Sequence, residues 1–176
     1  MGDRLAWLGL GGNLGDVRAA MIAALDFLDR FDEIEIARVS GLYETPPWGK
    51  TDQPAFLNAC AEIMTSLEPR ELLRACLGAE QALHRTRTEK WGPRTIDIDI
   101  LAIDGVEYAG EGLVIPHARL ADRAFALAPL SDLAPDLIVR GHRIGDLLAG
   151  LDMSAIRQLS PPSRWRRDAR LWSDAL

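Results

Sequence analysis

Two aspartates separated by one residue, Asp97 and Asp99, carry the clearest chemical signal in the sequence. They lie in an isoleucine-rich run, residues 96–101, whose composition is typical of a β-strand. Because side chains alternate between the faces of a strand, we expect both carboxylates on one face and the isoleucines on the other. Same-face neighbours are roughly 6–7 Å apart at Cα. Both acids could therefore bind a pair of hard cations, which two-metal sites hold about 3.5–4 Å apart.

The alternative is a half-exposed strand whose acids only face water, and a bare Asp-x-Asp leaves it open. The preceding segment favours a metal and phosphate site, because residues 85–94 contain four cations and one indole. A polyphosphate carries charge that arginines and metal ions share. Most of these cations are arginines, which make forked contacts to phosphate oxygens, and Trp91 offers a flat face to a ring. Taken alone, the segment could equally be a solvated basic loop.

Three other places contain residues suited to a flat, phosphorylated ligand. Phe56 and Asn58 share one face of a predicted strand, and an aromatic ring with an amide suits a heterocycle with donor and acceptor edges. Phe56 could equally belong to the core. Residues 44–49 form a rigid, proline-containing loop, and His117 and Arg123 are residue types that hold phosphate, although a lone histidine is more often structural.

The glycine-rich run at residues 9–15 invites comparison with a dinucleotide-binding loop. The match is poor, because the third glycine is missing and no acidic residue closes a second strand at the required spacing. We interpret the run as a tight turn from strand to helix, in which Asn13 can hydrogen-bond backbone or ligand.

Hydrophobic periodicity predicts the elements that position these residues. Strands are expected at residues 5–10, 33–43 (with a bulge near Arg38–Val39), 56–65 and 97–101, and helices at 16–30 and 69–84. This order predicts an α+β fold with a ferredoxin-like βαββαβ core, an antiparallel sheet with helices on one face. Additions after the core include a turn at residues 104–105, a short helix at 122–133 and a weakly ordered tail.

The 176 residues are most simply one catalytic domain over residues 1–160, followed by a tail over 161–176 that we expect to lie on its surface. The formal charge of -6 argues against nucleic acid as a partner. No apolar run predicts a signal peptide or a membrane span, so we expect a cytoplasmic protein without a membrane partner. Cys60 and Cys76 lack metal-ligand spacing and are expected to be reduced core thiols.

In this order, the segments closely resemble the hydroxymethyl-dihydropterin pyrophosphokinases (HPPK) of folate biosynthesis. The signature is Trp-Gly-Pro-Arg-x-x-Asp-x-Asp at residues 91–99, supported by residues 11–15, 43–47, 53–59 and 116–125, and the match spans roughly residues 4–148. The resemblance implies transfer of pyrophosphate from ATP to the hydroxymethyl group of the dihydropterin, leaving AMP. In such transfers the protein mainly positions groups and neutralises charge.

The resemblance also implies roles at matching positions of this chain. Asp97 and Asp99 would bind two magnesium ions, and Asp97 is a candidate proton acceptor. The catalytic set would be Arg85, Arg94 and Asp97. The ATP contacts would be Glu80, Arg85, Arg87, Arg94, Ile100, His117 and Arg123. The pterin contacts would be Thr45, Pro46, Pro47, Phe56, Asn58, Trp91, Asp97 and Phe125.

The sequence departs from the common family pattern at Leu77, Ala118 and Ala121, where polar residues are frequent, and at Phe56, which is often tyrosine. Two other classes of protein share parts of the pattern. A different metal-dependent nucleotidyl or phosphoryl transferase would keep the acid pair without Phe56, Asn58 and Trp91. A non-catalytic ferredoxin-like module would not need Asp97, Asp99 and Arg94 together.

Overall fold

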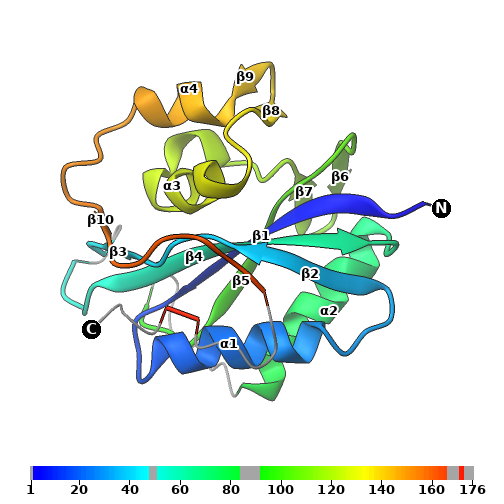
Figure 1. Cartoon of the computed structure of the whole chain (residues 1–176), viewed down its shortest axis with the longest axis horizontal. Coiled ribbons are helices and arrows are strands. Elements are labelled where there is room, and N and C mark those ends of the chain that lie inside the picture. Colours follow the sequence, from blue (N-terminus) through cyan, green and yellow to red (C-terminus); the bar gives the residue numbers. More distant parts are fainter. Residues whose placement is uncertain (1, 48–50, 84–91, 166–170, 173–176) are drawn as a thin grey trace.

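A seven-stranded sheet forms the centre of the computed structural model, which describes residues 2–47, 51–83, 92–165 and 171–172 (Figure 1). The core elements follow the order β1 (Arg4–Gly12), α1 (Val17–Leu28), β2 (Ile34–Val39), β3 (Tyr43–Thr45), β4 (Phe56–Thr65), α2 (Pro69–Ala82) and β5 (Asp97–Ile103). Every described strand pair in this sheet is antiparallel. β5 pairs with β1, β1 with β4, and β4 with both β2 and β3, as a ferredoxin-like core requires.

The strand expected over residues 33–43 is interrupted, and this prediction was wrong in its middle. Residues 40–42 separate β2 from β3. Ser40 is tied through its hydroxyl to the N–H of Cys60, and the N–H of Gly41 donates to Asp132 Oδ2 (2.9 Å). A Cβ on Gly41 would collide with the carbonyl oxygen of Ser160, so only glycine fits there. The expected bulge occurs as a register shift between Ile36 and Arg38, slightly earlier than predicted.

Helices cover both faces of the sheet: the two helices of the ferredoxin-like core share one face, as the sequence predicted, and helices after β5 cover the other. α1 and α2 cover the face that carries Leu8, Leu10, Ile63 and Ile98, and these residues form the larger core. The helix expected over residues 122–133 is a 3-10 turn (Leu120–Asp122) followed by α3 (Ala124–Leu133). With α4 (Ile144–Ala149), α3 packs on the opposite face over Trp7, Cys60 and Leu101 (Figure 1).

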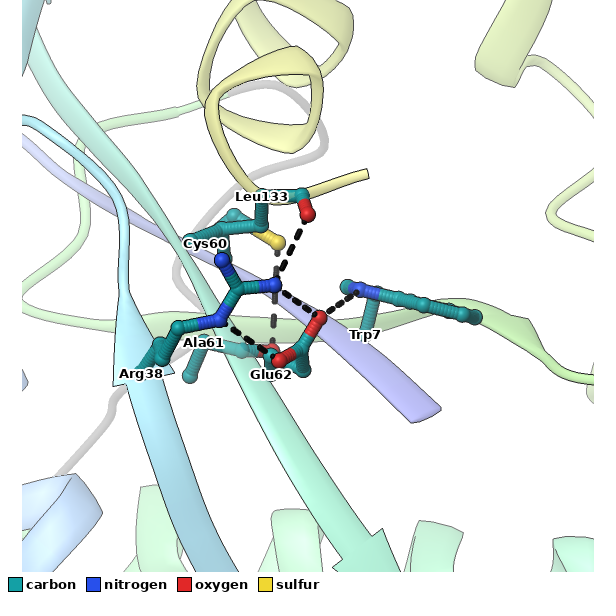
Figure 2. Close-up of polar contacts among 6 residues, drawn as sticks. All are labelled: Trp7, Arg38, Cys60, Ala61, Glu62 and Leu133. Atoms are coloured by element: carbon teal, nitrogen blue, oxygen red, sulfur yellow. Dashed lines mark hydrogen bonds and ion pairs between the residues drawn. The ribbon is translucent and has the colours of Figure 1, made fainter. Parts of the chain in front are cut away.

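A partly buried ion pair fastens the end of α3 to the sheet (Figure 2). Arg38 donates to both carboxylate oxygens of Glu62, at 2.8 and 2.7 Å, and Trp7 Nε1 donates to Glu62 Oε2 at 3.1 Å. The same guanidinium donates to the carbonyl oxygen of Leu133 (2.9 Å), the last residue of α3. This satisfies both the buried carboxylate and a helix-terminal carbonyl. Hydrogen bonding to Glu62 raises the pKa of Arg38.

Three residues after 160, Trp165, Leu171 and Trp172, are buried, so the expectation of a weakly ordered surface tail is wrong for them, whereas residues 161–164 are exposed. β10 (Arg157–Gln158) pairs with β3, and β11 (Ser163–Arg164) pairs with β2. Trp165, Leu171 and Trp172 join the larger core, and Trp172 Nε1 donates to the carbonyl of Ser40 (2.9 Å). These contacts cover the outer edges of β2 and β3. The boundary at residue 160 stays a prediction.

Two hairpins complete the described chain: β6 (Tyr108–Gly110) with β7 (Leu113–Ile115), and β8 (Ile138–Val139) with β9 (His142–Arg143). The turn expected at Asp104-Gly105 follows β5. Cys60 and Cys76 are both free and buried. None of the helices in the described ranges has the length and apolarity needed to cross a membrane.

Candidate active site

The acid pair lies on the face of the sheet that α3 covers only in part. Ile96, Ile98 and Ile100 point into the core with α1 and α2, while Asp97 and Asp99 are half-buried on the other face. This alternation agrees with the sequence prediction.

Gly11 of β1 leaves a gap beside Asp97, the glycine gap, whereas the position above Gly9 is filled by the Leu101 side chain. Gly11 stands opposite Asp97 on one side and Asn58 on the other, and Gly9 stands opposite Asp99. β1 therefore places no side chain between Asp97 and Asn58. A Cβ on Gly11 would lie 3.1 Å from Asn58 Oδ1, so the amide oxygen reaches over the glycine. The result is a row across β5, β1 and β4 with an acid at one end and an amide at the other.

Each acid contacts an arginine that also packs on an aromatic ring. Arg94 Nε lies 3.3 Å from Asp97 Oδ2, and Arg123 Nη1 lies 3.7 Å from Asp99 Oδ2. The Arg94 guanidinium lies 5.1 Å from the Phe56 ring centre, and that of Arg123 lies 5.6 Å from the Phe125 ring centre. These cations offset the repulsion between the two carboxylates, and cation–π contact helps to fix them.

The Nε–H groups of both arginines are buried and make no hydrogen bond among the described residues. The contact between Arg94 Nε and Asp97 is an ion pair that lacks hydrogen-bond geometry. Burial lowers the pKa of Arg123, and the nearby Asp99 partly counters the effect. An arginine stays protonated despite such a shift. Two half-buried guanidinium groups with donor capacity suit an anionic ligand with several oxygens.

Asn13 holds together the loops on either side of the acid pair. Its Nδ2 donates to Gln53 Oε1 (3.1 Å) and to the carbonyl of Pro54 (3.0 Å), while its Oδ1 accepts from the Arg94 N–H (3.0 Å). The N–H of Asn13 also donates to the Arg94 carbonyl (2.9 Å). The Arg94 backbone is therefore fixed at both its N–H and its C=O by one buried residue.

The far end of the row is built by β3 and β4. Thr45 stands opposite Phe56 in the register, and Asn58 Nδ2 donates to Thr45 Oγ1 (2.8 Å). All three residues are buried. Pro46 and Pro47 follow Thr45 directly, the first exposed and the second half-buried. With its amide nitrogen occupied by Thr45, Asn58 presents its Oδ1 to the row.

His117 lies after β7 and is fixed by its backbone, because its N–H donates to the Leu101 carbonyl of β5 (2.8 Å). Burial and the nearby cations Arg123 and Arg119 lower the pKa of His117 to about 4. Nδ1 accepts a hydrogen bond from the Arg119 N–H (3.2 Å), so the neutral ring carries its proton on Nε2. At neutral pH this histidine is an uncharged Nε2–H donor.

The described residues contain no cluster of three or more histidine, cysteine or acidic side chains that could hold a metal alone. Asp97 and Asp99 supply hard oxygen ligands, the type that magnesium prefers. Magnesium commonly takes only one or two carboxylates from a protein and completes its coordination with phosphate oxygens and water. The donor set therefore fits magnesium that arrives with a phosphate-bearing substrate.

A family model described as 7,8-dihydro-6-hydroxymethylpterin-pyrophosphokinase (HPPK) matches residues 7–135. The chain belongs to the HPPK family. Two relatives named 2-amino-4-hydroxy-6-hydroxymethyldihydropteridine pyrophosphokinase match nearly end to end. The one from Methylorubrum extorquens is 47% identical over 154 residues, covering 88% of this chain and 98% of that protein. The one from Pseudomonas aeruginosa is 40% identical over 154 residues, covering 87% and 95%.

Solved HPPK-DHPS structures share the fold. A structure of HPPK-DHPS in complex with substrates has a TM-score of 0.67 at 14% identity and covers 92% of this chain. A Plasmodium falciparum HPPK-DHPS with pteroate has a TM-score of 0.66 at 16% identity and covers 84%. The chain spans about half the length of these solved chains, at 48% and 42%. Family membership and the full-length relatives make this chain a pyrophosphokinase of folate biosynthesis.

The HPPK site residues predicted from the sequence fall into four groups, one of which lies outside the described residues. Eight lie around the acid face or on the segments that border it: Asp97, Asp99, Arg94, Phe56, Asn58, Thr45, Arg123 and Phe125. Pro46, Pro47 and His117 lie on segments that lead away from β3 and β7. Arg85, Arg87 and Trp91 are outside the described residues.

Glu80 and Ile100 form the remaining group, and their side chains are not on the acid face of this HPPK. Glu80 is buried on α2, and its Oε1 accepts from the Ile98 N–H of β5 (2.7 Å). The Ile100 side chain lies in the core between α1, α2 and the sheet. Glu80 therefore contacts β5 from the core face, and the side chain of Ile100, a residue of β5, points to that same face.

Sequence reasoning missed the glycine gap in β1 and the arginine–ring contacts. Gly9 and Gly11 alternate along a strand as Asp97 and Asp99 do, and that shared period of two was the available signal. The pairing of Arg123 with Asp99 had no sequence signal, because the two residues belong to separate segments joined only by the fold.

Proposed function

We propose that this pyrophosphokinase takes the terminal diphosphate of ATP, bound with magnesium, and transfers it to the hydroxymethyl group of 6-hydroxymethyl-7,8-dihydropterin, releasing AMP. The observation that carries the proposal is the arrangement at β5. Two same-face carboxylates, Asp97 and Asp99, each contact an arginine, and the glycine gap separates this charged end from Asn58 and Phe56. The charged end suits a triphosphate and its cations, and the amide end suits a heterocycle.

Asp97 and Asp99 are the proposed magnesium ligands for two ions. Magnesium would supply charge neutralisation at the phosphates and would lower the pKa of the attacking hydroxyl. The described chain contributes Arg94 and Arg123, whose guanidinium groups already lie next to the acids. Together with Arg85 and Arg87, they are proposed to bind the triphosphate, and Arg85 and Arg94 are proposed to contact the transferred group. Asp97 is proposed as the proton acceptor.

The nucleotide is proposed to run from the acid pair toward the outer edge of β5. His117 contributes a neutral Nε2–H donor, because its pKa of about 4 keeps the ring uncharged at neutral pH. The side chains of Glu80 and Ile100 lie on the core face of β5, and both residues are proposed to support the nucleotide site from there. Since the Ile100 side chain is in the core, a nucleotide contact there would use its backbone.

The pterin is proposed to occupy the row over Gly11, with Asn58 Oδ1 accepting from the ring's exposed N–H groups. Phe56 bounds this row and is itself held by the Arg94 guanidinium. Thr45 positions the Asn58 amide by accepting its N–H (2.8 Å). Pro46, Pro47, Trp91 and Phe125 are proposed to complete the pocket. A cytoplasmic site of action is part of the proposal.

The test is an assay for AMP release from ATP, with and without the dihydropterin, in magnesium and after chelation. We expect AMP only when ATP, magnesium and the dihydropterin are all present. Asp99→Asn should remove the activity, while Glu107→Gln, at an exposed carboxylate outside the site, should leave it unchanged. AMP release that does not depend on the pterin, or that persists after chelation, would contradict the proposal.

A further inference from the structure

The turn between β8 and β9 contains an arginine in a backbone conformation that arginine rarely adopts. The two turn residues, Arg140 and Gly141, have φ values of 52° and 82°. Positive φ at both positions is the pattern of a two-residue type I′ hairpin, which favours asparagine, aspartate or glycine at its first position. Gly141 fits this preference and Arg140 does not. Such residues persist where surrounding contacts hold them, and many lie at functional sites.

The Arg140 side chain reaches the segment that carries His117. Its Nη1 donates to the carbonyl of Ala118 (3.3 Å) and its Nη2 to the carbonyl of Pro116 (3.5 Å). One planar guanidinium therefore spans the two peptide carbonyls on either side of His117, more than 20 residues away along the chain. Both hydrogen bonds are long and solvent-exposed, so their value to overall stability is small. They act instead by restricting where the His117 backbone lies.

The other constraints on His117 come from the sheet side and from its own turn. Its N–H donates to the Leu101 carbonyl (2.8 Å), its carbonyl accepts from the Leu120 N–H (3.0 Å), and its Nδ1 accepts from the Arg119 N–H (3.2 Å). Arg140 adds a contact from a different hairpin. Together these contacts fix both the backbone of His117 and the direction of its Nε2–H.

We propose that Arg140 is a positioning residue of the nucleotide site: by bridging the carbonyls of Pro116 and Ala118, it holds the His117 segment so that the imidazole donates to the nucleotide. The inference rests on the nucleotide contact proposed above for His117. An arginine is suited to this position because its rigid fork reaches two carbonyls at once, which the single ammonium of lysine does not do in the same geometry.

The decisive variant is Arg140→Asn, because its effects on stability and on binding differ. Asparagine suits the first position of a type I′ turn, so the melting temperature should be unchanged or higher. Its short side chain cannot bridge the two carbonyls. We expect the affinity for a non-hydrolysable ATP analogue with magnesium to fall about five- to tenfold, the scale of one lost positioning contact. The KM for the dihydropterin should not change.

The matched control is Arg143→Asn, which removes the same charge from the same hairpin. Arg143 donates to Asp136 (3.1 Å) and is well exposed, and no described contact joins it to the His117 segment. This control should leave nucleotide affinity unchanged. Arg140→Lys, which keeps the charge, should recover only part of the lost affinity. An equal loss in the Arg143 variant would attribute the effect to net charge and refute the inference.

A double-mutant cycle with His117→Ala separates this inference from the proposed function. If Arg140 acts through His117, Arg140→Asn should have little further effect on nucleotide affinity once the imidazole is gone. If His117→Ala weakens nucleotide binding and the two losses add fully, the proposed role of Arg140 is wrong, but the proposed nucleotide contact of His117 is not. If His117→Ala leaves nucleotide affinity unchanged, the proposed nucleotide contact of His117 is wrong and the inference fails with it.

Discussion

Replacing Asn13 should both destabilise the protein and slow its reaction, because this side chain joins two loops of the site. In Asn13→Ala, three hydrogen bonds are lost: those to Gln53 Oε1, to the Pro54 carbonyl and from the Arg94 N–H. The groups left behind are partly buried. At about 1 kcal/mol for each net hydrogen bond, with more for a buried group left unpaired, we expect a loss of roughly 2–4 kcal/mol in the free energy of unfolding.

Asn13→Asp is the sharper variant, because it changes almost no volume. Its Oδ1 can still accept from the Arg94 N–H, but the former amide nitrogen becomes an oxygen facing the Pro54 carbonyl. The Gln53 amide can rotate to donate, whereas the Pro54 carbonyl cannot. One partly buried acceptor is thus left unpaired beside a carboxylate oxygen, which costs about 1–3 kcal/mol.

Denaturant unfolding and steady-state kinetics on the same samples measure both effects. For a chain of this size, 1 kcal/mol shifts the melting temperature by about 2–4 °C. Because Asn13→Ala frees the Arg94 N–H, kcat should fall at least about tenfold in that variant, whereas Asn13→Asp keeps both contacts to Arg94 and should lose mainly stability. Gln53→Ala, which removes one contact, is the control and should retain most stability. Wild-type stability in Asn13→Asp, or a wild-type rate in Asn13→Ala, would refute the reasoning.

Four further outcomes follow from the site. Asp97→Ala and Asp99→Ala should each abolish turnover while keeping the melting temperature within a few degrees, because removing one acid relieves like-charge repulsion; near-normal turnover in either would exclude it as a metal ligand. Asn58→Leu should weaken pterin binding by about 1–3 kcal/mol with nucleotide affinity unchanged, and equal losses for both ligands would make Asn58 a scaffold residue. By calorimetry, pterin should bind far more tightly when an ATP analogue and magnesium are present, and equal affinities would contradict ordered binding. Proton NMR should find the His117 ring titrating near pH 4. Between pH 6.5 and 4 the unfolded chain then takes up a proton that the folded chain does not, so the free energy of unfolding falls as the pH drops through that window. A midpoint near 6.5 would refute the assignment of His117 as a neutral donor.

Elements whose pattern is local could be predicted closely from the sequence. The strand expected over residues 56–65 is β4 with the same bounds, and the helix expected over 69–84 is α2, which ends at Ala82. In both, the side chains that define the period also make the packing contacts. The isoleucine–aspartate alternation of β5 is correct for the same reason.

Features that depend on distant partners could not be predicted. The break between β2 and β3 arises where Gly41 meets Asp132 and Ser160, which lie 91 and about 120 residues further along the chain. The end of α3 is tied to the sheet by Arg38, which also pairs with Glu62, and no pattern in the sequence indicated this pairing. A charged residue is placed inside a fold by its partner, and single-sequence patterns do not identify partners.

The same distinction applies to the candidate site and bears on how it could work. The sequence identified Asp97, Asp99, Arg94 and Arg123 as chemical groups, but their pairing comes from the fold. In the structure each acid is already neutralised by an arginine. On the proposed function, binding of a nucleotide with magnesium would exchange these partners: the acids would hold the metal, and the arginines would hold the phosphates. No charge is then left alone in a partly buried site, because each exchange replaces one ion pair by another. Phe56 and Phe125 keep the arginine heads close to the acids during this exchange, since the cation–π contacts do not use the guanidinium N–H groups that phosphate oxygens need.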